Sequence, residues 1–243
     1  MSVQKVLSIL FVPVMFAACG DDDSDFVSHP DGKGASSSAD VIPGSTGNLT
    51  DSRDGQAYRT VTIGTQTWMA ENLNYKTANS FCYEDKANNC EKYGRLYSWA
   101  AAMDSVGEFG LNGKGCGHDT TCSPEYPLRG ICPEGWHLPV QDEFEELFAA
   151  VGGDSVAARV LKSKMGWNDD GNGTDEFGFT LLSTGYRNGS GEYYFEGIGS
   201  NFWYSMEFDE FKAYAVTIYD DADRVYRENL SKYLYLAVRC IKD

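Results

Sequence analysis

The central part of the chain begins with an alternation of β-branched and polar positions. Residues 58–63 alternate in this way, Gly64 and Thr65 provide a turn, and a second short run follows at residues 66–69. Alternation with a period of two, interrupted by a glycine-containing dipeptide, is typical of two antiparallel strands. The pattern therefore predicts a β-hairpin at the start of the folded domain.

Apolar positions at helical spacing follow in three places. Side chains three or four positions apart share one face of a helix. The first set comprises Leu96, Trp99, Ala100 and Met103. The second set comprises Phe144, Leu147, Phe148 and Val151. Asp142 and Glu143 precede this second set, where the helix dipole favours negative charge. A third, shorter amphipathic helix is predicted over residues 155–164.

Short strands dominate the chain from residue 177 onward. They are predicted over residues 177–182, 193–196, 202–205, 213–219 and 234–241. In the last of these, Leu236 and Val238 share a face with Cys240, which places this cysteine on the core side together with Leu234. Early helices and late antiparallel strands predict one α+β domain with two or three helices, long loops and disulfides.

The N-terminal residues predict export and lipid attachment. Residues 1–19 contain an apolar run too short to span a bilayer. The stretch Phe16-Ala17-Ala18-Cys19 resembles a lipobox, in which the cysteine receives the lipid. The alternative is an ordinary signal peptide cut after Ala18. Residues 20–53 are rich in Gly, Ser, Asp and Pro, which predicts a disordered acidic tether before a domain at residues 54–243.

Charge narrows the range of partners. The formal net charge is -16, and a phosphate backbone needs a surface of lysine and arginine, so nucleic acid is not an expected partner. The same charge disfavours docking on anionic lipid. We therefore expect the membrane to be reached only through the lipid on Cys19, at the outer membrane or the cell surface.

Six cysteines remain after Cys19, and an even number in an exported chain predicts a disulfide framework. Fifteen pairings are formally open. The spacing would let two pairs close locally and leave a third pair to close most of the domain into one ring. These pairs would be Cys82 with Cys90, Cys116 with Cys122, and Cys132 with Cys240, although spacing alone leaves the local pairing open. A zinc site is disfavoured because no Cys-x-x-Cys occurs and the histidines are scattered.

Several motifs in a fixed order resemble a known family. They occupy residues 54–64, 66–75, 93–103, 132–139, 172–179, 185–189 and 238–240. Together they resemble the Fibrobacter succinogenes major paralogous domain. The resemblance implies a C-type-lectin-like fold, shared with formylglycine-generating enzymes, and a bond between Cys132 and Cys240. It implies no known activity. Val140 stands where related motifs carry Ser or Thr, so the side-chain cap of the following helix would be missing.

One loop concentrates oxygen ligands beside glycines. Calcium binds six to eight oxygens, and a glycine-rich loop lets the chain wrap around the ion. The candidate ligands are Asn168, Asp170, Asn172 and Asp175. The EF-hand pattern fails because Phe179 stands where its bidentate glutamate belongs. The alternative is a polar loop whose side chains satisfy its own backbone.

Aromatic residues gather in the late strands and could stack on sugars or a peptide. Seven aromatic positions between residues 186 and 204 form this set, with polar neighbours. The candidate ligand-binding residues are Arg187, Asn188, Tyr193 and Trp203. Because neighbouring strand residues alternate between faces, about half of the set must point into the core.

We therefore expect a non-enzymatic, lipid-anchored binding module whose ligand is a polysaccharide or a surface protein. Two alternatives belong to other classes. One is a structural envelope lipoprotein. The other is an enzyme related to formylglycine-generating proteins, which would require a reactive cysteine pair holding copper, whereas every cysteine after Cys19 has a plausible structural partner.

Overall fold

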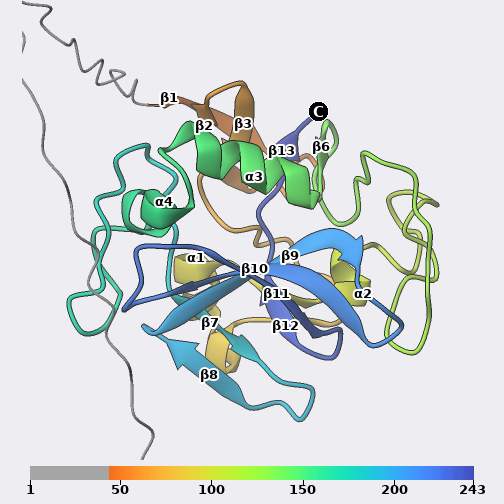
Figure 1. Ribbon diagram of the computed structural model, residues 1–243. Helices are drawn as coiled ribbons and strands as arrows, with labels where there is room; N and C mark the ends of the chain where they lie inside the picture. Colours follow the sequence, from red (N-terminus) through yellow and green to blue (C-terminus); the bar gives the residue numbers. More distant parts are fainter. Residues whose placement is uncertain (1–43) are drawn as a thin grey trace, which may run out of the picture. The chain divides into compact units, whose positions relative to one another are not determined.

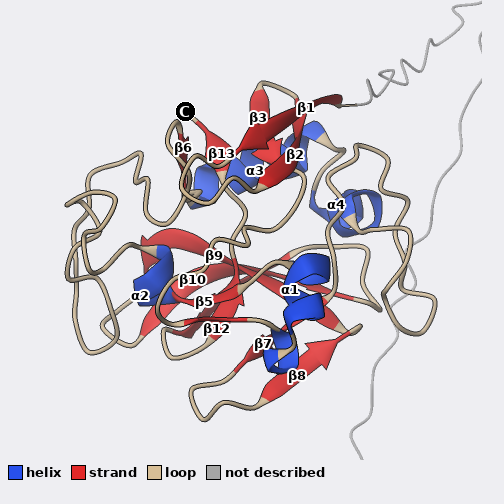
Figure 2. Ribbon diagram, turned by 180° about the vertical axis from the view of Figure 1, so that it is seen from behind, coloured by secondary structure: helices blue, strands red, loops and turns tan. Residues whose placement is uncertain are grey.

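The computed structural model describes residues 44–243. The predicted signal peptide, the lipidation site Cys19 and residues 20–43 of the predicted tether lie outside the described residues. The described part is an α+β domain with two sheets, short helices and long loops (Figures 1 and 2). No helix within it is long and apolar enough to cross a membrane.

The ordered domain begins earlier than residue 54. Strand β1 (Ser45–Thr50) pairs antiparallel with β2 (Ala57–Ile63), so the predicted tether is wrong for these residues. After β1 the chain turns at Asp51, which is buried and accepts hydrogen bonds from the backbone N–H and guanidinium of Arg53. Composition could not reveal β1, because an exposed edge strand is held mainly by backbone hydrogen bonds.

The smaller sheet has the strand order β1-β2-β3-β13-β6. Its hairpin of β2 and β3 (Gln66–Met69) confirms the strand pair that alternation predicts. The final strand β13 (Ile241–Lys242) lies between β3 and β6 (Trp136–His137). The C-terminal residues therefore close the sheet against strands from the beginning and the middle of the chain.

The larger sheet has the order β11-β10-β9-β7-β12-β5-β4, and β8 pairs with β7. Its strands are β4 (Ser80–Phe81), β5 (Leu96–Ser98), β7 (Thr184–Arg187), β8 (Tyr193–Glu196), β9 (Gly199–Glu207), β10 (Lys212–Tyr219), β11 (Tyr226–Ser231) and β12 (Tyr235–Ala237). The predicted strands at residues 193–196, 202–205 and 213–219 are confirmed within β8, β9 and β10.

Two strand predictions are wrong in part. Residues 177–182 form a loop whose alternate side chains, Phe177, Phe179 and Leu181, are buried without forming a strand. Residues 234–241 form two strands instead of one, because β12 joins the larger sheet and β13 the smaller. Between them the chain crosses the core, and Cys240 is fully buried as predicted.

The described residues contain four α-helices: α1 (Ala87–Tyr93), α2 (Trp99–Ala102), α3 (Gln141–Ala150) and α4 (Asp154–Leu161), with a 3₁₀ turn at Tyr83–Asp85. Helices α3 and α4 confirm two predictions, whereas α1 was not predicted. The first predicted helix is wrong at its start, because Leu96 pairs with Ala237 in the sheet. There the helix is the single turn α2, capped by the hydroxyl of Ser98, which accepts from the N–H of Ala101.

Helix α3 joins the two sheets. The ring of Phe144 lies 4.9 Å from that of Trp68 in the smaller sheet and 5.2 Å from that of Tyr204 in the larger one. Figure 1 shows α3 crossing between the sheets. Val140 gives helix α3 no side-chain cap, as predicted. The carboxylate of Glu143 accepts from the N–H of Val140 at 2.9 Å, which satisfies one half of the usual reciprocal pair.

Three disulfides are present among the described residues, and they confirm the pairing that spacing favours. They join Cys82 to Cys90, Cys116 to Cys122, and Cys132 to Cys240. The last spans 108 residues and ties the segment before β6 to the segment before β13.

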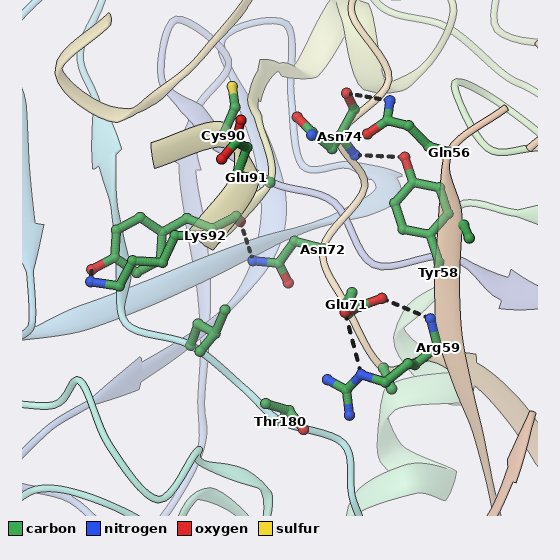
Figure 3. Close-up of a pocket in the computed structure, with 15 residues that line it drawn as sticks. Gln56, Tyr58, Arg59, Glu71, Asn72, Asn74, Cys90, Glu91, Lys92 and Thr180 are labelled. Carbon is green, nitrogen blue, oxygen red and sulfur yellow. Dashed lines mark hydrogen bonds and ion pairs between the residues drawn. The ribbon is translucent and has the colours of Figure 1, made fainter. Parts of the chain in front are cut away.

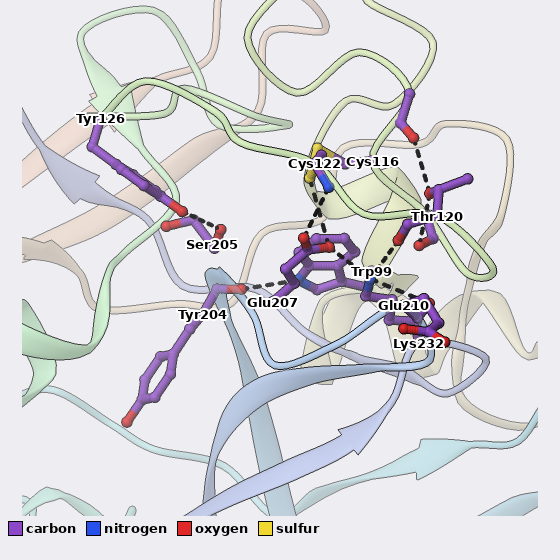
Figure 4. Close-up of a disulfide and its surroundings, with 12 residues drawn as sticks. Trp99, Cys116, Thr120, Cys122, Tyr126, Tyr204, Ser205, Glu207, Glu210 and Lys232 are labelled. Atoms are coloured by element: carbon purple, nitrogen blue, oxygen red, sulfur yellow. Dashed lines mark hydrogen bonds and ion pairs between the residues drawn. A yellow bond between two sulfur atoms is a disulfide. The ribbon is translucent and has the colours of Figure 1, made fainter.

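A buried ion pair holds the loop that the disulfide of Cys116 and Cys122 closes (Figure 4). The ammonium of Lys232, whose side chain is fully buried, donates to a carboxylate oxygen of Glu207 at 2.8 Å and to the carbonyl of Thr120 at 3.1 Å. The carboxylate of Glu207 also accepts from the N–H of Cys122. The loop is therefore anchored to the larger sheet by charge and by hydrogen bonds.

Candidate functional site

The hairpin of β7 and β8 separates the predicted ligand-binding residues onto two faces. Tyr186 lies opposite Tyr194, and Arg187 lies opposite Tyr193. Because neighbouring residues in a strand point to opposite faces, Tyr186 and Tyr194 share one face, while Arg187 and Tyr193 share the other. The ring centroids of Tyr186 and Tyr194 lie 5.5 Å apart.

Trp203 does not contribute to either surface, so its prediction as a ligand-binding residue is wrong. Its side chain is fully buried, and its indole N–H donates to the carbonyl of Tyr97 at 2.8 Å. Phe202 and Tyr204 on the same strand are also buried. The strand β9 lies between β10 and β7, and its residues from Gly199 to Ser205 are all buried, which the sequence pattern alone could not indicate.

Arg187 and Tyr193 stabilise the hairpin instead of presenting a free binding surface. The guanidinium of Arg187 lies 4.0 Å from the ring centre of Phe81 and 4.8 Å from that of Tyr235. The hydroxyl of Tyr193 donates to Asp85 at 2.7 Å. Burial, and this hydrogen bond, raise the pKa of Tyr193 to about 12, so its hydroxyl keeps its proton at neutral pH.

Asn188 closes the turn of the same hairpin. Its side-chain amide donates to the carboxylate of Glu192 at 2.8 Å, and its oxygen accepts from the N–H of Glu192 at 2.9 Å. The hydrogen bonds from Asn188, followed by the one from Tyr194, lower the pKa of the exposed Glu192. Asn188 therefore fixes the hairpin tip, and its predicted role in ligand binding stays a prediction.

A groove lies on the other face of this hairpin and was not predicted. It has a volume of about 150 Å³ and is lined by Tyr186, Phe195, Asn201, Tyr219, Glu228, Leu230 and Leu234. Strands β7 to β11 each contribute at least one of these side chains. We refer to this site as the aromatic groove.

Two polar side chains in the aromatic groove are positioned by one hydroxyl. Thr217 donates to the amide oxygen of Asn201 at 2.7 Å and lies 3.3 Å from a carboxylate oxygen of Glu228. The amide nitrogen of Asn201 has no hydrogen-bond partner among the described residues. Glu228 therefore supplies acceptors and Asn201 a donor at the same surface.

The hydroxyl of Tyr219 completes the polar edge of the groove, 3.5 Å from the other carboxylate oxygen of Glu228. Burial raises the pKa of Tyr219, and the negative charge of Glu228 raises it further. The phenol thus remains protonated and can donate a hydrogen bond at neutral pH.

The backbone of Phe195 explains how two successive aromatic residues reach one surface. In a regular strand Phe195 would point away from Tyr194, yet its ring lies 5.6 Å from that of Tyr186. Its φ of 66° is left-handed, a conformation that a bulky residue adopts at a cost of the order of 1–3 kcal/mol. Opposite it, Gly185 has a φ of 61°, and a Cβ there would collide with the carbonyl oxygen of Tyr194.

Strain of this kind gathers at functional sites, because the surrounding structure must enforce it. Here the result is a row of aromatic rings in which Tyr194 and Phe195 remain 40% and 43% exposed. Both residues belong to the aromatic set predicted from the sequence. Tyr219, Asn201 and Glu228 were not predicted, because strand β11 has no strong alternation and the polar pair meets only across three strands.

The four candidate calcium ligands engage several different partners in the protein. The side-chain oxygen of Asn172 accepts from the N–H of Trp167 at 3.1 Å. The carboxylate of Asp175 accepts from both the N–H and the hydroxyl of Thr180. Asn168 lies against Gly197, and Asp170 is exposed with a left-handed φ of 62°.

Residues 44–243 contain no group of three or more His, Cys, Asp or Glu side chains arranged to hold a metal ion. The arrangement of the loop agrees with the alternative of a polar loop that satisfies its own backbone. Calcium binding at this loop stays a prediction.

The fold and the groove define an α+β domain, cross-linked by disulfides, that carries a row of exposed aromatic rings on one sheet. A family model described as the Fibrobacter succinogenes major domain matches residues 61–242, and the chain belongs to this family. No curated protein matches the chain. No solved structure matches it either.

Proposed function

We propose that this domain is a non-enzymatic binding module that holds a polysaccharide in the aromatic groove. The observation that carries the proposal is the meeting of Tyr186, Phe195 and Tyr219 with the carboxylate of Glu228 at one surface. Aromatic faces pack against the C–H faces of sugar rings, and carboxylates and amides bind their hydroxyls.

The size of the groove supports an extended ligand. Its volume of about 150 Å³ is below the roughly 300 Å³ at which pockets begin to enclose a whole small molecule. A groove of this size would hold one ring of a chain whose neighbouring units rest on exposed aromatics such as Tyr194.

The proposal also includes the fold of the module and its attachment to a membrane. The family resemblance supports a C-type-lectin-like fold, and the lipobox supports a lipid anchor on Cys19 at the outer membrane or cell surface. The six cysteines after Cys19 are all bonded to one another, which disfavours chemistry of the formylglycine-generating kind because no free thiol pair remains for copper.

The test uses the chain from Gly20 onward, which lacks the signal peptide and the lipidated cysteine. Binding to plant-fibre polysaccharides is measured by sedimentation with insoluble substrates, with and without calcium. We expect binding that Tyr219→Ala and Glu228→Gln each weaken. Tyr233→Ala is the matched control, since Tyr233 is 57% exposed but lies outside the groove.

Three outcomes would count against the proposal. An equal loss of polysaccharide binding in Tyr233→Ala would show that the groove is not the site. Binding that requires calcium would indicate that the site is the loop of Asp170 and Asp175. If none of the polysaccharides binds, a protein partner or a structural envelope role is favoured.

A further inference from the structure

A second cavity shares no lining residue with the aromatic groove. It has a volume of about 240 Å³ and is bordered by β2, by the segment after β3 and by α1 (Figure 3). Its polar lining includes Arg59, Glu71, Asn72, Asn74 and Thr180. We refer to it as the Arg59 cavity.

The guanidinium of Arg59 makes only some of the hydrogen bonds that it can donate. The backbone N–H of Arg59 donates to one carboxylate oxygen of Glu71 at 2.7 Å, and its Nε lies 3.3 Å from the other. The two terminal nitrogens have no hydrogen-bond partner among the described residues. In Figure 3 the guanidinium lies between Glu71 and Thr180, with these nitrogens turned away from Glu71.

A second cation lies directly behind the wall of the Arg59 cavity. Arg239 is fully buried and donates to the side-chain oxygen of Asn72 at 3.0 Å and to the carbonyl of Thr180 at 3.1 Å, and both of these residues line the cavity. No carboxylate among the described residues lies within ion-pair distance of it. Burial lowers the pKa of Arg239 to about 9, so the side chain is still a cation at neutral pH.

A buried charge without a counter-ion is costly, and the charge of Arg239 is screened little by water. Its carbonyl partners disperse the charge but do not neutralise it. An anion in the cavity would be attracted by this field and by the free edge of Arg59. The flat edge of a guanidinium matches a carboxylate, which it binds through two parallel hydrogen bonds.

We propose that the Arg59 cavity binds the carboxylate group of a small ligand. A singly charged carboxylate fits better than a phosphate dianion, because Glu71 and Glu91 also line the cavity and repel a second negative charge. Lys92, the other cation of the lining, lies 4.0 Å from the carboxylate of Glu196, which offsets its charge. This site is independent of the aromatic groove and does not rest on the function proposed for it.

Asn74 indicates that the ligand carries hydroxyl groups as well as a carboxylate. Its side-chain oxygen is buried without a hydrogen-bond partner among the described residues. In Figure 3 its amide points across the cavity toward Glu91. A ligand hydroxyl that met this oxygen after a small rotation of the amide would satisfy it. The site therefore favours a carboxylate that also carries hydroxyls, such as a sugar acid.

Calorimetric titration of the chain from Gly20 onward with four probes tests the proposal. The probes are galacturonate, acetate, galactose and inorganic phosphate. We expect both carboxylates to bind, galacturonate more tightly than acetate, and galactose to bind at least about tenfold more weakly than galacturonate. Equal binding of galactose and galacturonate, tighter binding of phosphate, or no binding of either carboxylate would each overturn the proposal.

Three variants localise the site. Arg59→Gln should weaken galacturonate binding by about tenfold or more, because the paired hydrogen bonds are lost. Glu71→Gln should tighten it, since a competing negative charge is removed. Arg159→Gln is the matched control, because Arg159 pairs with Asp223 and has a side chain 45% exposed, against 53% for Arg59, but lies outside the cavity. Equal losses in the two arginine variants would indicate a long-range charge effect and refute the site.

Discussion

Nδ1 of His137 lies 2.7 Å from Oδ1 of Asp243, although the two residues are 106 positions apart. On the other side of the ring, Nε2 lies 2.7 Å from a carboxylate oxygen of Glu143 in the first turn of α3. The imidazole thus connects the end of the chain to the helix that joins the two sheets. Burial alone would lower the pKa of His137, but the two carboxylates outweigh it and raise the pKa above its usual value.

This arrangement predicts a pH-dependent contribution to stability. Because the folded-state pKa is raised, the contribution of the charged imidazole is complete below the unfolded pKa of about 6.5 and is lost as pH rises through the folded pKa. Urea unfolding of the wild type and of His137→Gln should therefore show a stability difference that shrinks as the pH is raised through this window. A difference that stays constant with pH would contradict the ion pairing.

The long-range disulfide should contribute more to stability than a local one. Replacing Cys132 and Cys240 by serine opens a loop of 108 residues and should cost about 5 kcal/mol in the chain-entropy model. The matched variant, Cys82→Ser with Cys90→Ser, opens a loop of only 8 residues and should cost about 2–3 kcal/mol. Thermal unfolding under non-reducing conditions compares the two, and an unchanged melting temperature for the first variant would refute the bond's role.

The left-handed backbone of Phe195 predicts an unusual order of stabilities. At an ordinary strand position alanine is more stabilising than glycine, but at positive φ glycine avoids the clash of Cβ with the backbone. Phe195→Gly should therefore be about 1 kcal/mol more stable than Phe195→Ala. Both variants lose the ring and should lose polysaccharide binding alike. The reverse order of stabilities would show that the backbone is not strained.

Replacement of Lys232 should destabilise the domain, because its ammonium is the counter-ion of Glu207. Its removal in Lys232→Met leaves Glu207 without its counter-ion in a mostly buried position, at a cost of about 3 kcal/mol. The double variant with Glu207→Gln should recover part of that loss, because the orphaned charge is also removed. Equilibrium unfolding of the wild type, the two single variants and the double variant gives a double-mutant cycle. If the losses of unfolding free energy in the two single variants add up to the loss in the double variant, the two side chains do not interact.

Local patterns in the sequence were sufficient for several elements. The hairpin at residues 58–69 follows from alternation around Gly64, and α3 follows from a stripe of apolar residues behind Asp142 and Glu143. The pairing of the cysteines followed from spacing, since two pairs are close enough to bond locally. The hairpin, the helix and the two local disulfides depend on residues that are close in the sequence, whereas the third disulfide joins the two cysteines left over, 108 positions apart.

The faces of the late strands could not be predicted in the same way. Alternation indicates that Tyr186 and Arg187 point in opposite directions, but not which direction is covered. The same uncertainty led to the prediction of Trp203 as a ligand-binding residue, whereas its side chain is fully buried. What covers a face comes from elements distant in the chain, and the sequence does not show which these are.

The sequence by itself therefore determined the family, the α+β class and the first hairpin, and its spacing favoured the cysteine pairs that the structure confirms. The export signal and the lipid anchor stay predictions. Only the tertiary structure decided that β1 belongs to the domain, that residues 234–241 divide between two sheets, and that Tyr219 and Glu228 meet Phe195 in one groove. The physical reason is that propensity and periodicity act over a few residues. Burial and the composition of a site depend on which surfaces meet when the whole chain packs.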